Sequence, residues 1–193
     1  FNTITLGLFT GLICALLAIV INFSIRFTKN KFLERLNSLM SIGYAIPGLI
    51  LAVGITRFLV FSDQNVFTNI NFVITGSLVG LLLAYIIKSY ALANSSIESG
   101  YERISNSIDN SAQLLGSSGG KLLGRIHFPL MRTSFLTAVL LVTSEVVKEL
   151  PATLILRPFN FDTLAVITYT YAAEERMYPV SYTHLTLPTT EAV

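Results

Sequence analysis

Charged residues are scarce in this chain. Of its 193 residues, 12% are Asp, Glu, Lys or Arg, about half the share found in an average soluble domain. This scarcity excludes an ordinary soluble domain, and the hydrophobic residues gather in long blocks, as they do in membrane proteins. The formal net charge is only +2 and no basic cluster is present, so the chain lacks the charge pattern of a nucleic-acid-binding protein.

Cysteine is nearly absent, and so are the motifs of common enzymes. Cys14 is the single cysteine, so it cannot form an internal disulfide, and its apolar surroundings predict a packing role. The stretch GSSGGKLLG departs from a phosphate-binding loop because Gly116 comes one residue too late and Leu122 replaces the required Ser or Thr. His127 stands alone and is expected to pack rather than to bind a metal. We therefore predict no catalytic residue, metal site or cofactor.

Long apolar blocks predict an all-α, multi-spanning transmembrane helix bundle. A spanning helix needs about 20 apolar residues. Four blocks meet this requirement: Thr3–Ile25, Leu39–Phe61, Phe72–Ala93 and Leu130–Val147. A fifth stretch, Thr163–Ala172, is too short to span.

The links between these blocks differ in their content of Lys and Arg. The first link is basic and carries Arg26, Lys29, Lys31 and Arg35. The long segment after the third helix is also basic, and it is framed by Lys88, Arg103, Lys121, Arg125 and Arg132. The second link, FSDQNVFTN, holds neither Lys nor Arg, although Arg57 lies just before it. Because cytoplasmic links carry the excess of Lys and Arg, the first and third links should face the cytoplasm.

Glycine and proline mark positions inside the predicted helices. Gly7 and Gly11, and likewise Gly76 and Gly80, are spaced four apart, which places two small residues on one helix face. This spacing favours close helix packing, unless it only reflects how common glycine is in membrane helices. Pro47 should kink the second helix, and such a bend is tolerated in lipid only inside a bundle.

The longest polar stretch, GYERISNSIDNSAQLLGSSGGKLLGRIHFP (residues 100–129), interrupts the apolar pattern. It predicts two short amphipathic helices, with Gly116 ending the first. Their apolar residues are Ile104, Ile108, Ala112 and Leu115 in the first, and Leu122, Leu123 and Ile126 in the second, before Pro129. Such a segment either lies on the membrane surface or docks a partner.

Part of this stretch resembles a known family motif. The spacing N-S-A-x-x-x-G-x9-I-x-F-P is similar to the EAA motif of bacterial ABC importer permeases, E-A-A-x-x-x-G-x9-I-x-L-P. The matching positions are Ala112, Gly116, Ile126 and Pro129, and the departing ones are Asn110, Ser111 and Phe128. The motif's usual Glu is therefore missing, although Asp109 is adjacent.

Two further stretches, GYAIPGLILAVG (43–54) and KELPATLILRPFNFDTLA (148–165), resemble the ferric-iron branch of these permeases. The resemblance covers residues 1–180 as the C-terminal copy of the ABC transmembrane type-1 domain. It implies a subunit of the bacterial inner membrane that is not itself an enzyme. Its residues 98–129 would present a coupling helix to an ABC ATPase subunit. The other implied partners are an extracytoplasmic solute-binding protein, a second permease copy or half, and the lipid bilayer. The family also moves thiamine, polyamines and phosphonates.

Both ends of the chain depart from the family pattern. The chain begins Phe-Asn-Thr, without Met and without a visible signal peptide, so we expect earlier residues to be missing. The family continues beyond EERMYPV with another apolar span, whereas residues 181–193, SYTHLTLPTTEAV, are short and rich in Thr. We expect this tail to be unstructured and foreign to the family.

Three charged residues end the fourth helix. Glu145, Lys148 and Glu149 are spaced to share one helix face, on which Glu145 and Lys148 can neutralise each other. Glu149 would then remain as a net negative charge. The face either carries a packing salt bridge or, as the resemblance implies, lines the translocation path. Rival interpretations are a secondary transporter and a membrane-embedded enzyme that use the same three charges.

Overall fold

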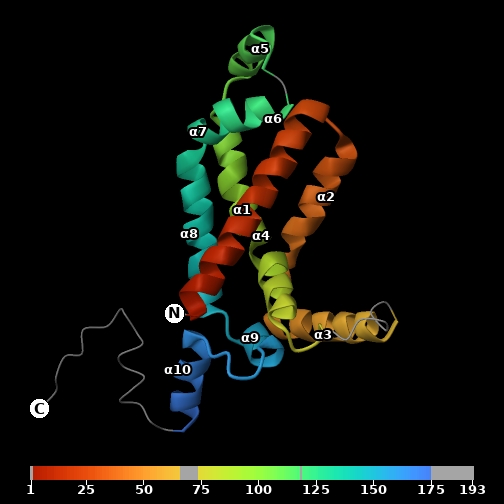
Figure 1. The fold of residues 1–193 in the computed structure, drawn as a ribbon, viewed down its shortest axis with the longest axis vertical. Helices are drawn as coiled ribbons and strands as arrows, with labels where there is room; N and C mark the ends of the chain where they lie inside the picture. The colour runs from red at the N-terminus through yellow and green to blue at the C-terminus, as the bar shows by residue number, and fades with distance from the viewer. Residues whose placement is uncertain (1, 66–73, 118, 175–193) are drawn as a thin grey trace, which may run out of the picture.

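The computed structural model describes residues 2–65, 74–117 and 119–174, and every regular element in these ranges is a helix (Figure 1). Four helices run along the molecule: α1 (Asn2–Thr28), α2 (Lys31–Ser41), α4 (Leu78–Glu102) and α8 (Arg132–Lys148). The helix α3 (Gly48–Asn65) crosses one end of this bundle beside α9 (Pro151–Leu156), and α10 (Leu164–Ala173) lies at the same end. The predicted all-α membrane bundle is confirmed.

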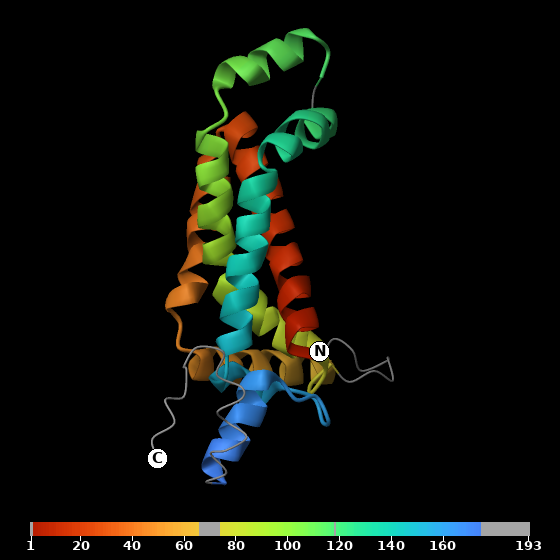
Figure 2. The ribbon, with the colours of Figure 1, turned by 90° about the vertical axis from the view of Figure 1, so that its left-hand side faces the viewer.

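The opposite end carries the polar stretch. There the helix α5 (Asn106–Leu114) sits above α6 (Gly119–Leu122), a π-helical turn (Leu123–His127) and α7 (Phe128–Leu130) (Figure 2). The C-terminus of α1 and the start of α2 lie at the same end. We call it the basic end, because it carries Arg26, Lys29, Lys31, Lys121, Arg125 and Arg132. The prediction that the two basic links lie on one side of the bundle is confirmed.

Two of the described helices, α1 and α4, are each long and apolar enough to cross a bilayer. Two bent pairs provide up to two further spans: α2 with α3, and the helical run Gly119–Leu130 with α8. The described helices therefore provide the four predicted spans only if each bent pair counts as one span.

The centre of the bundle is a close contact between α1 and α8. A Cβ atom added to Gly11 would lie 2.8 Å from the carbonyl oxygen of Val139, and one on Gly7 would lie 2.9 Å from the Cγ2 atom of Thr143. Only glycine leaves room for this approach, which is the close packing that the spacing of Gly7 and Gly11 favours. Cys14 is fully buried in the same core, as expected.

The second predicted glycine pair is wrong for Gly76. This residue has φ +78° and lies just before the N-cap Ser77 of α4, whose side chain accepts the N–H of Val79. The left-handed conformation ends the preceding turn, so Gly76 cannot share a helix face with Gly80. Gly80 does pack closely, since an added Cβ atom would lie 2.7 Å from Cδ1 of Leu59.

The second predicted span, Leu39–Phe61, is a broken helix rather than a kinked one. After α2 the chain makes a 3-10 turn (Ile42–Ala45), and α3 then leaves at 116° to the first half. Ile46, directly before Pro47, is extended with φ −78° and ψ 126°, because the proline ring disfavours helical backbone in the residue before it. Pro47 thus starts a new helix, and its carbonyl accepts the N–H of Leu51 (3.0 Å).

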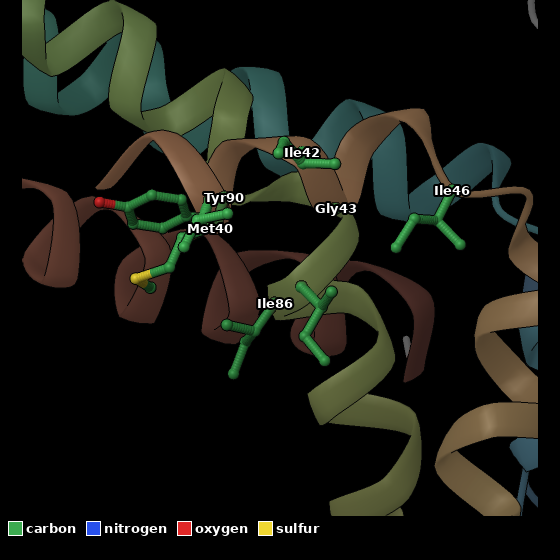
Figure 3. Close-up of a pocket in the computed structure, with 8 residues that line it drawn as sticks. Met40, Ile42, Gly43, Ile46, Ile86 and Tyr90 are labelled. Atoms are coloured by element: carbon green, nitrogen blue, oxygen red, sulfur yellow. The ribbon is translucent and has the colours of Figure 1, made fainter. Parts of the chain in front are cut away.

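An apolar hollow of about 190 Å³ lies beside this break, between α4 and the 3-10 turn (Figure 3). Its lining is formed by Leu39, Met40, Ile42, Gly43, Ile46, Ile86, Ile87 and Tyr90. The Tyr90 hydroxyl is already bound, since it donates to Oδ1 of Asn37 (2.6 Å). The hollow therefore offers no free polar side chain to a solute.

Candidate functional site: the coupling segment and the buried charges

The helix α5 carries the first half of the motif and has well-formed ends. The Ser105 side chain accepts the N–H of Ser107 (3.2 Å) at its start. At its end the N–H of Ser117 donates to the carbonyl of Ala112 and that of Gly116 to the carbonyl of Gln113, each at 2.9 Å. These two bonds form a Schellman motif, and Gly116 occupies its left-handed position with φ +80°. The prediction that Gly116 ends this helix is confirmed.

The apolar stripe predicted for α5 is only half present. Ile104 and Ala112 are buried, but Ile108 is 38% exposed and Leu115 is 86% exposed. Leu115 follows the last helical residue with ψ near 11°, so it no longer continues the helical stripe. Together with Leu114, which is 89% exposed, it forms an apolar tip at the end of the molecule.

Asp109 anchors α5 to the bundle. Its side chain is buried and accepts hydrogen bonds from Nε of Arg26 (2.7 Å) and from Nε2 of His127 (2.8 Å). The other guanidinium nitrogens of Arg26 donate to the carbonyls of Tyr101 (2.9 Å) and Ile104 (2.7 Å). One arginine therefore ties the end of α1 to the end of α4 and to α5 through charge-assisted bonds.

His127 completes this cluster from the π-helical turn. It is fully buried, and the rings of Phe23, Phe27 and Tyr101 surround it with centroids 5.5 to 6.0 Å away. Burial lowers the pKa of His127, against the opposing effect of its hydrogen bond to Asp109. Its Nδ1 has no hydrogen-bond partner among the described residues, which also favours the neutral ring. The predicted packing role of His127 is confirmed.

Sequence reasoning missed the contact between these three residues. Arg26, Asp109 and His127 come from three separate segments, and no local spacing connects them. Two signals in the sequence could have indicated this contact. Asp109 lies beside the position of the missing motif Glu, and His127 is a single histidine between apolar neighbours. Within the described ranges no group of three or more His, Cys, Asp or Glu side chains converges on a metal site.

The second half of the motif runs from Gly119 to Leu130 as one helical segment. Leu122 is buried and Leu123 and Ile126 are half-buried, as predicted. The N–H of Phe128 donates to the carbonyl of Leu123, five residues earlier. Pro129 has no N–H and its ring excludes the carbonyl four residues before it, which accounts for the widened turn.

Pro129 is not itself the bend before α8. The segment Gly119–Leu130 meets α8 at 76°, and the break falls at Met131, which has φ −100° and ψ 5°. Met131 is buried in the bundle core. The change of direction between the polar segment and α8 therefore occurs two residues after Pro129.

The motif residues divide between the surface and the interior. Asn110, Ser111, Gly116 and Pro129 are exposed, whereas Ala112 is buried and Ile126 is half-buried. The exposed side of α5 at this end thus combines polar motif residues with the apolar tip.

The charged residues at the end of α8 separate into two ion pairs. Glu145 and Lys148 pair with each other at 3.3 Å, as predicted, and the Lys148 side chain is 67% exposed. Glu149 lies beyond the last helical residue with φ −75° and ψ 111°, so it does not share their helix face. The nearby Pro151 has no N–H to continue α8 and instead begins α9.

Glu149 is buried and forms an ion pair with Lys88 of α4. Its Oε1 accepts the N–H of Ala152 (3.4 Å), and a Cβ atom on Gly48 would lie 2.5 Å from this oxygen. Thr153 donates to the Glu149 carbonyl, again bringing α9 against the same residue (2.6 Å). The expected net negative charge at Glu149 is therefore wrong. Lys88, which lies inside α4, neutralises it.

The chain is similar to two bacterial permease proteins, and no protein-family model matches it. It is 24% identical over 169 residues to the Fe(3+)-transport system permease protein FbpB 2 of Haemophilus influenzae, covering 88% of this chain and 31% of that protein. It is 27% identical over 167 residues to the putative 2-aminoethylphosphonate transport system permease protein PhnV of Salmonella typhimurium, covering 86% of this chain and 60% of that protein.

These similarities support the ABC permease family that the motif suggests, and they fit a transport subunit rather than an enzyme. The chain spans about a third and about three fifths of the lengths of the two proteins it matches. Together with the apolar helices, they identify it as a multi-pass protein of the bacterial inner membrane.

Proposed function

We propose that the chain is the transmembrane permease subunit of an ATP-driven importer, with residues 1–180 as one type-1 domain. One observation carries this proposal. The helix α5 holds its apolar tip, Leu114 and Leu115, outside the bundle, while the buried Asp109 fixes the other side of the helix. An exposed apolar patch beside polar residues is typical of a docking surface, and here its occupant is the ABC ATPase.

The buried cluster provides a route for movement. When the ATPase closes and displaces α5, Asp109 pulls on Arg26 and His127, and through them on the ends of α1 and α4. The hinge at Met131 lets α8 change its angle to the same segment. ATP binding would bias the bundle between two conformations with alternating access. A solute-binding protein and a second permease copy would complete the assembly on the outer side and across the path.

Ferric iron is the leading solute, supported by the FbpB 2 similarity and by the stretch KELPATLILRPF. A phosphonate is the second candidate, because the chain is equally well covered by its match to PhnV. Uptake of radiolabelled ferric iron and of 2-aminoethylphosphonate, measured in cells with and without the intact transporter, separates the two.

The docking proposal is tested with the double variant Leu114→Asp/Leu115→Asp in the assembled transporter. We expect the purified permease to lose its ATPase subunit and the coupled ATPase activity, because two charges replace the apolar tip. The control is Phe159→Asp, a fully exposed residue before α10 at the opposite end of the bundle. Retention of the ATPase by the double variant would contradict the proposal.

A path role for Glu145, Lys148 and Glu149 remains a prediction, and the proposal does not require it. A secondary transporter that uses these charges would take up solute under an ion gradient without ATP. Uptake into vesicles energised only by a proton gradient would therefore favour the rival interpretation.

A further inference from the structure

A polar groove runs between the basic-end halves of α4 and α8. Its volume is about 260 Å³. Figure 2 shows α4 and α8 side by side here, with no other described helix in front of them. The groove is lined by Ser95, Ser96 and Ser99 of α4, by Arg103 directly after α4, and by Thr133, Ser134 and Thr137 of α8. Six hydroxyl groups and one guanidinium thus share a single cavity on the outside of two spanning units.

The spacing shows that these residues form a continuous face. Ser95 and Ser99 are four apart on α4, and Arg103, the C-cap with helical φ and ψ, continues this spacing. Thr133 and Thr137 are four apart on α8, so each set lies along one side of its helix. Gly100 brings the two helices close together next to this face, since an added Cβ atom would lie 2.7 Å from Oγ of Ser134. The backbone of α4 therefore packs directly against the Ser134 side chain of α8 beside the groove.

The polar groups of the groove are not used by the fold. Elsewhere in the bundle, helix hydroxyls such as those of Thr10, Ser24 and Thr143 donate to the carbonyl four residues earlier, at 2.7 to 2.8 Å. Among the described residues, none of the six groove hydroxyls has such a bond, and Arg103 has no ion pair. Unpaired polar groups facing lipid are costly, so this face must meet water, protein or a polar ligand.

The charge of the lining defines the ligand. Arg103 is the only ionised side chain in the groove, and the carboxylates of Glu98 and Glu102 on the same helix do not line it. A hard metal cation needs carboxylate oxygens, which this lining lacks. A guanidinium with several hydroxyl donors matches the oxygens of a phosphate or phosphonate.

We propose that this groove binds an oxyanion of the phosphate or phosphonate class. Arg103, Thr133 and Ser134 also line an adjoining hollow of about 130 Å³ that reaches Ile108 of α5, so the bound anion would lie next to the coupling segment. The assignment rests on the proposed importer function and favours the second candidate solute, or iron carried in an anionic complex, over a bare ferric ion.

The test measures binding, which needs neither the ATPase nor ATP. The full chain is placed in nanodiscs of phosphatidylcholine, and binding of inorganic phosphate and of methylphosphonate is measured by equilibrium dialysis. We expect Arg103→Gln to weaken both by at least about tenfold, because a charge-assisted bond is lost, and Thr137→Val to weaken them by about threefold. Arg132→Gln is the matched control, since Arg132 lies at the same end, carries the same charge and does not line the groove.

Three other outcomes of the binding experiment overturn the assignment. Absence of saturable phosphate binding by the unmodified chain removes the site. Equal weakening by Arg103→Gln and Arg132→Gln shows a general charge effect. If phosphatidylglycerol in the nanodiscs abolishes phosphate binding, the groove is a lipid headgroup site and not a solute site. Loss of ATP-driven uptake with intact phosphate binding would contradict the importer function alone.

Discussion

At the scale of single residues, two buried charges in this bundle depend on partners that lie far away in the sequence. Asp109 is held by Arg26 and His127 at the basic end, and Glu149 by Lys88 at the other. Buried charges are tolerated only when paired and hydrogen-bonded. Asp109 holds α5, which follows α4, against the bundle, and Glu149 does the same for the turn between α8 and α9. Each ion pair therefore fixes the position of a connecting segment.

His127 gives the molecule a defined dependence on pH. Burial lowers its pKa below the ordinary value of 6.5, so the unfolded chain takes up a proton at a higher pH than the folded chain does. The free energy of unfolding should therefore fall as the pH drops below about 6.5. Thermal unfolding in detergent between pH 7.5 and pH 5 measures this loss. In His127→Gln, which keeps a donor toward Asp109, the loss should be smaller; parallel curves for the two proteins would refute the assignment.

Glu149 distinguishes a structural charge from a transport charge. Glu149→Gln leaves Lys88 buried without its counter-ion, which should cost about 3–5 kcal/mol of stability. The double variant Lys88→Met/Glu149→Gln removes both charges and should recover most of that stability. Stability is measured by unfolding in detergent and transport as uptake per folded complex. If the double variant is stable but uptake stays lost, Glu149 acts in the path and not only in packing.

At the scale of elements, several local features were readable from the sequence because they depend on near neighbours. Gly116 ends α5 because it adopts the left-handed conformation expected after a helix, with φ +80°. Gly7 and Gly11 pack closely against α8, as their spacing favours. Pro47 was recognised as a disturbance, but its effect was underestimated. Whether a proline bends or breaks a helix also depends on what the two halves pack against, and α3 packs against α4 and α9, which lie outside the local sequence.

Distant pairings escaped the same reasoning. The sequence placed Glu149 on the helix of Glu145 and Lys148, and it grouped Lys88, at the end of the third predicted helix, with the basic cytoplasmic segment. Glu149 is instead buried against the half-buried Lys88, 61 positions away in the sequence. No periodicity links two such positions, because their contact is produced by the tertiary arrangement of α4 and α9. The same limit explains why the Arg26–Asp109 bond was not foreseen.

The end of α5 gives a prediction at this scale. Gly116→Val places a β-branched residue at φ +80°, which should cost about 1–2 kcal/mol and loosen the last turn of α5. Association with the ATPase should decrease together with coupled ATPase activity. Co-purification of the two subunits from the full transporter measures the association. Gly120→Val is the control, because its added side chain meets nothing within 4 Å and its φ is not positive. Equal effects of the two substitutions would mean that the glycine bend has no special part in docking.

At the scale of the whole molecule, the bundle has two chemically different ends. One carries Arg26, Lys29, Lys31, Lys121, Arg125 and Arg132 together with α5, and the other carries α3, α9 and α10. Lys and Arg are retained on the cytoplasmic side of short links, and an ATPase is reached only from that side. The charge asymmetry and the docking proposal therefore require the same orientation, although they rest on different residues.

This orientation is open to a direct test that uses the scarcity of cysteine. The single native cysteine, Cys14, is fully buried, so it should not react with a membrane-impermeant thiol reagent. Leu115→Cys places a thiol at the apolar tip and Phe159→Cys places one before α10, at positions that are 86% and 102% exposed. In intact cells without an outer membrane, only Phe159→Cys should be labelled, whereas Leu115→Cys should react only after the membrane is opened. Labelling of Leu115→Cys in sealed cells would put α5 outside, and an ATPase could then not bind it.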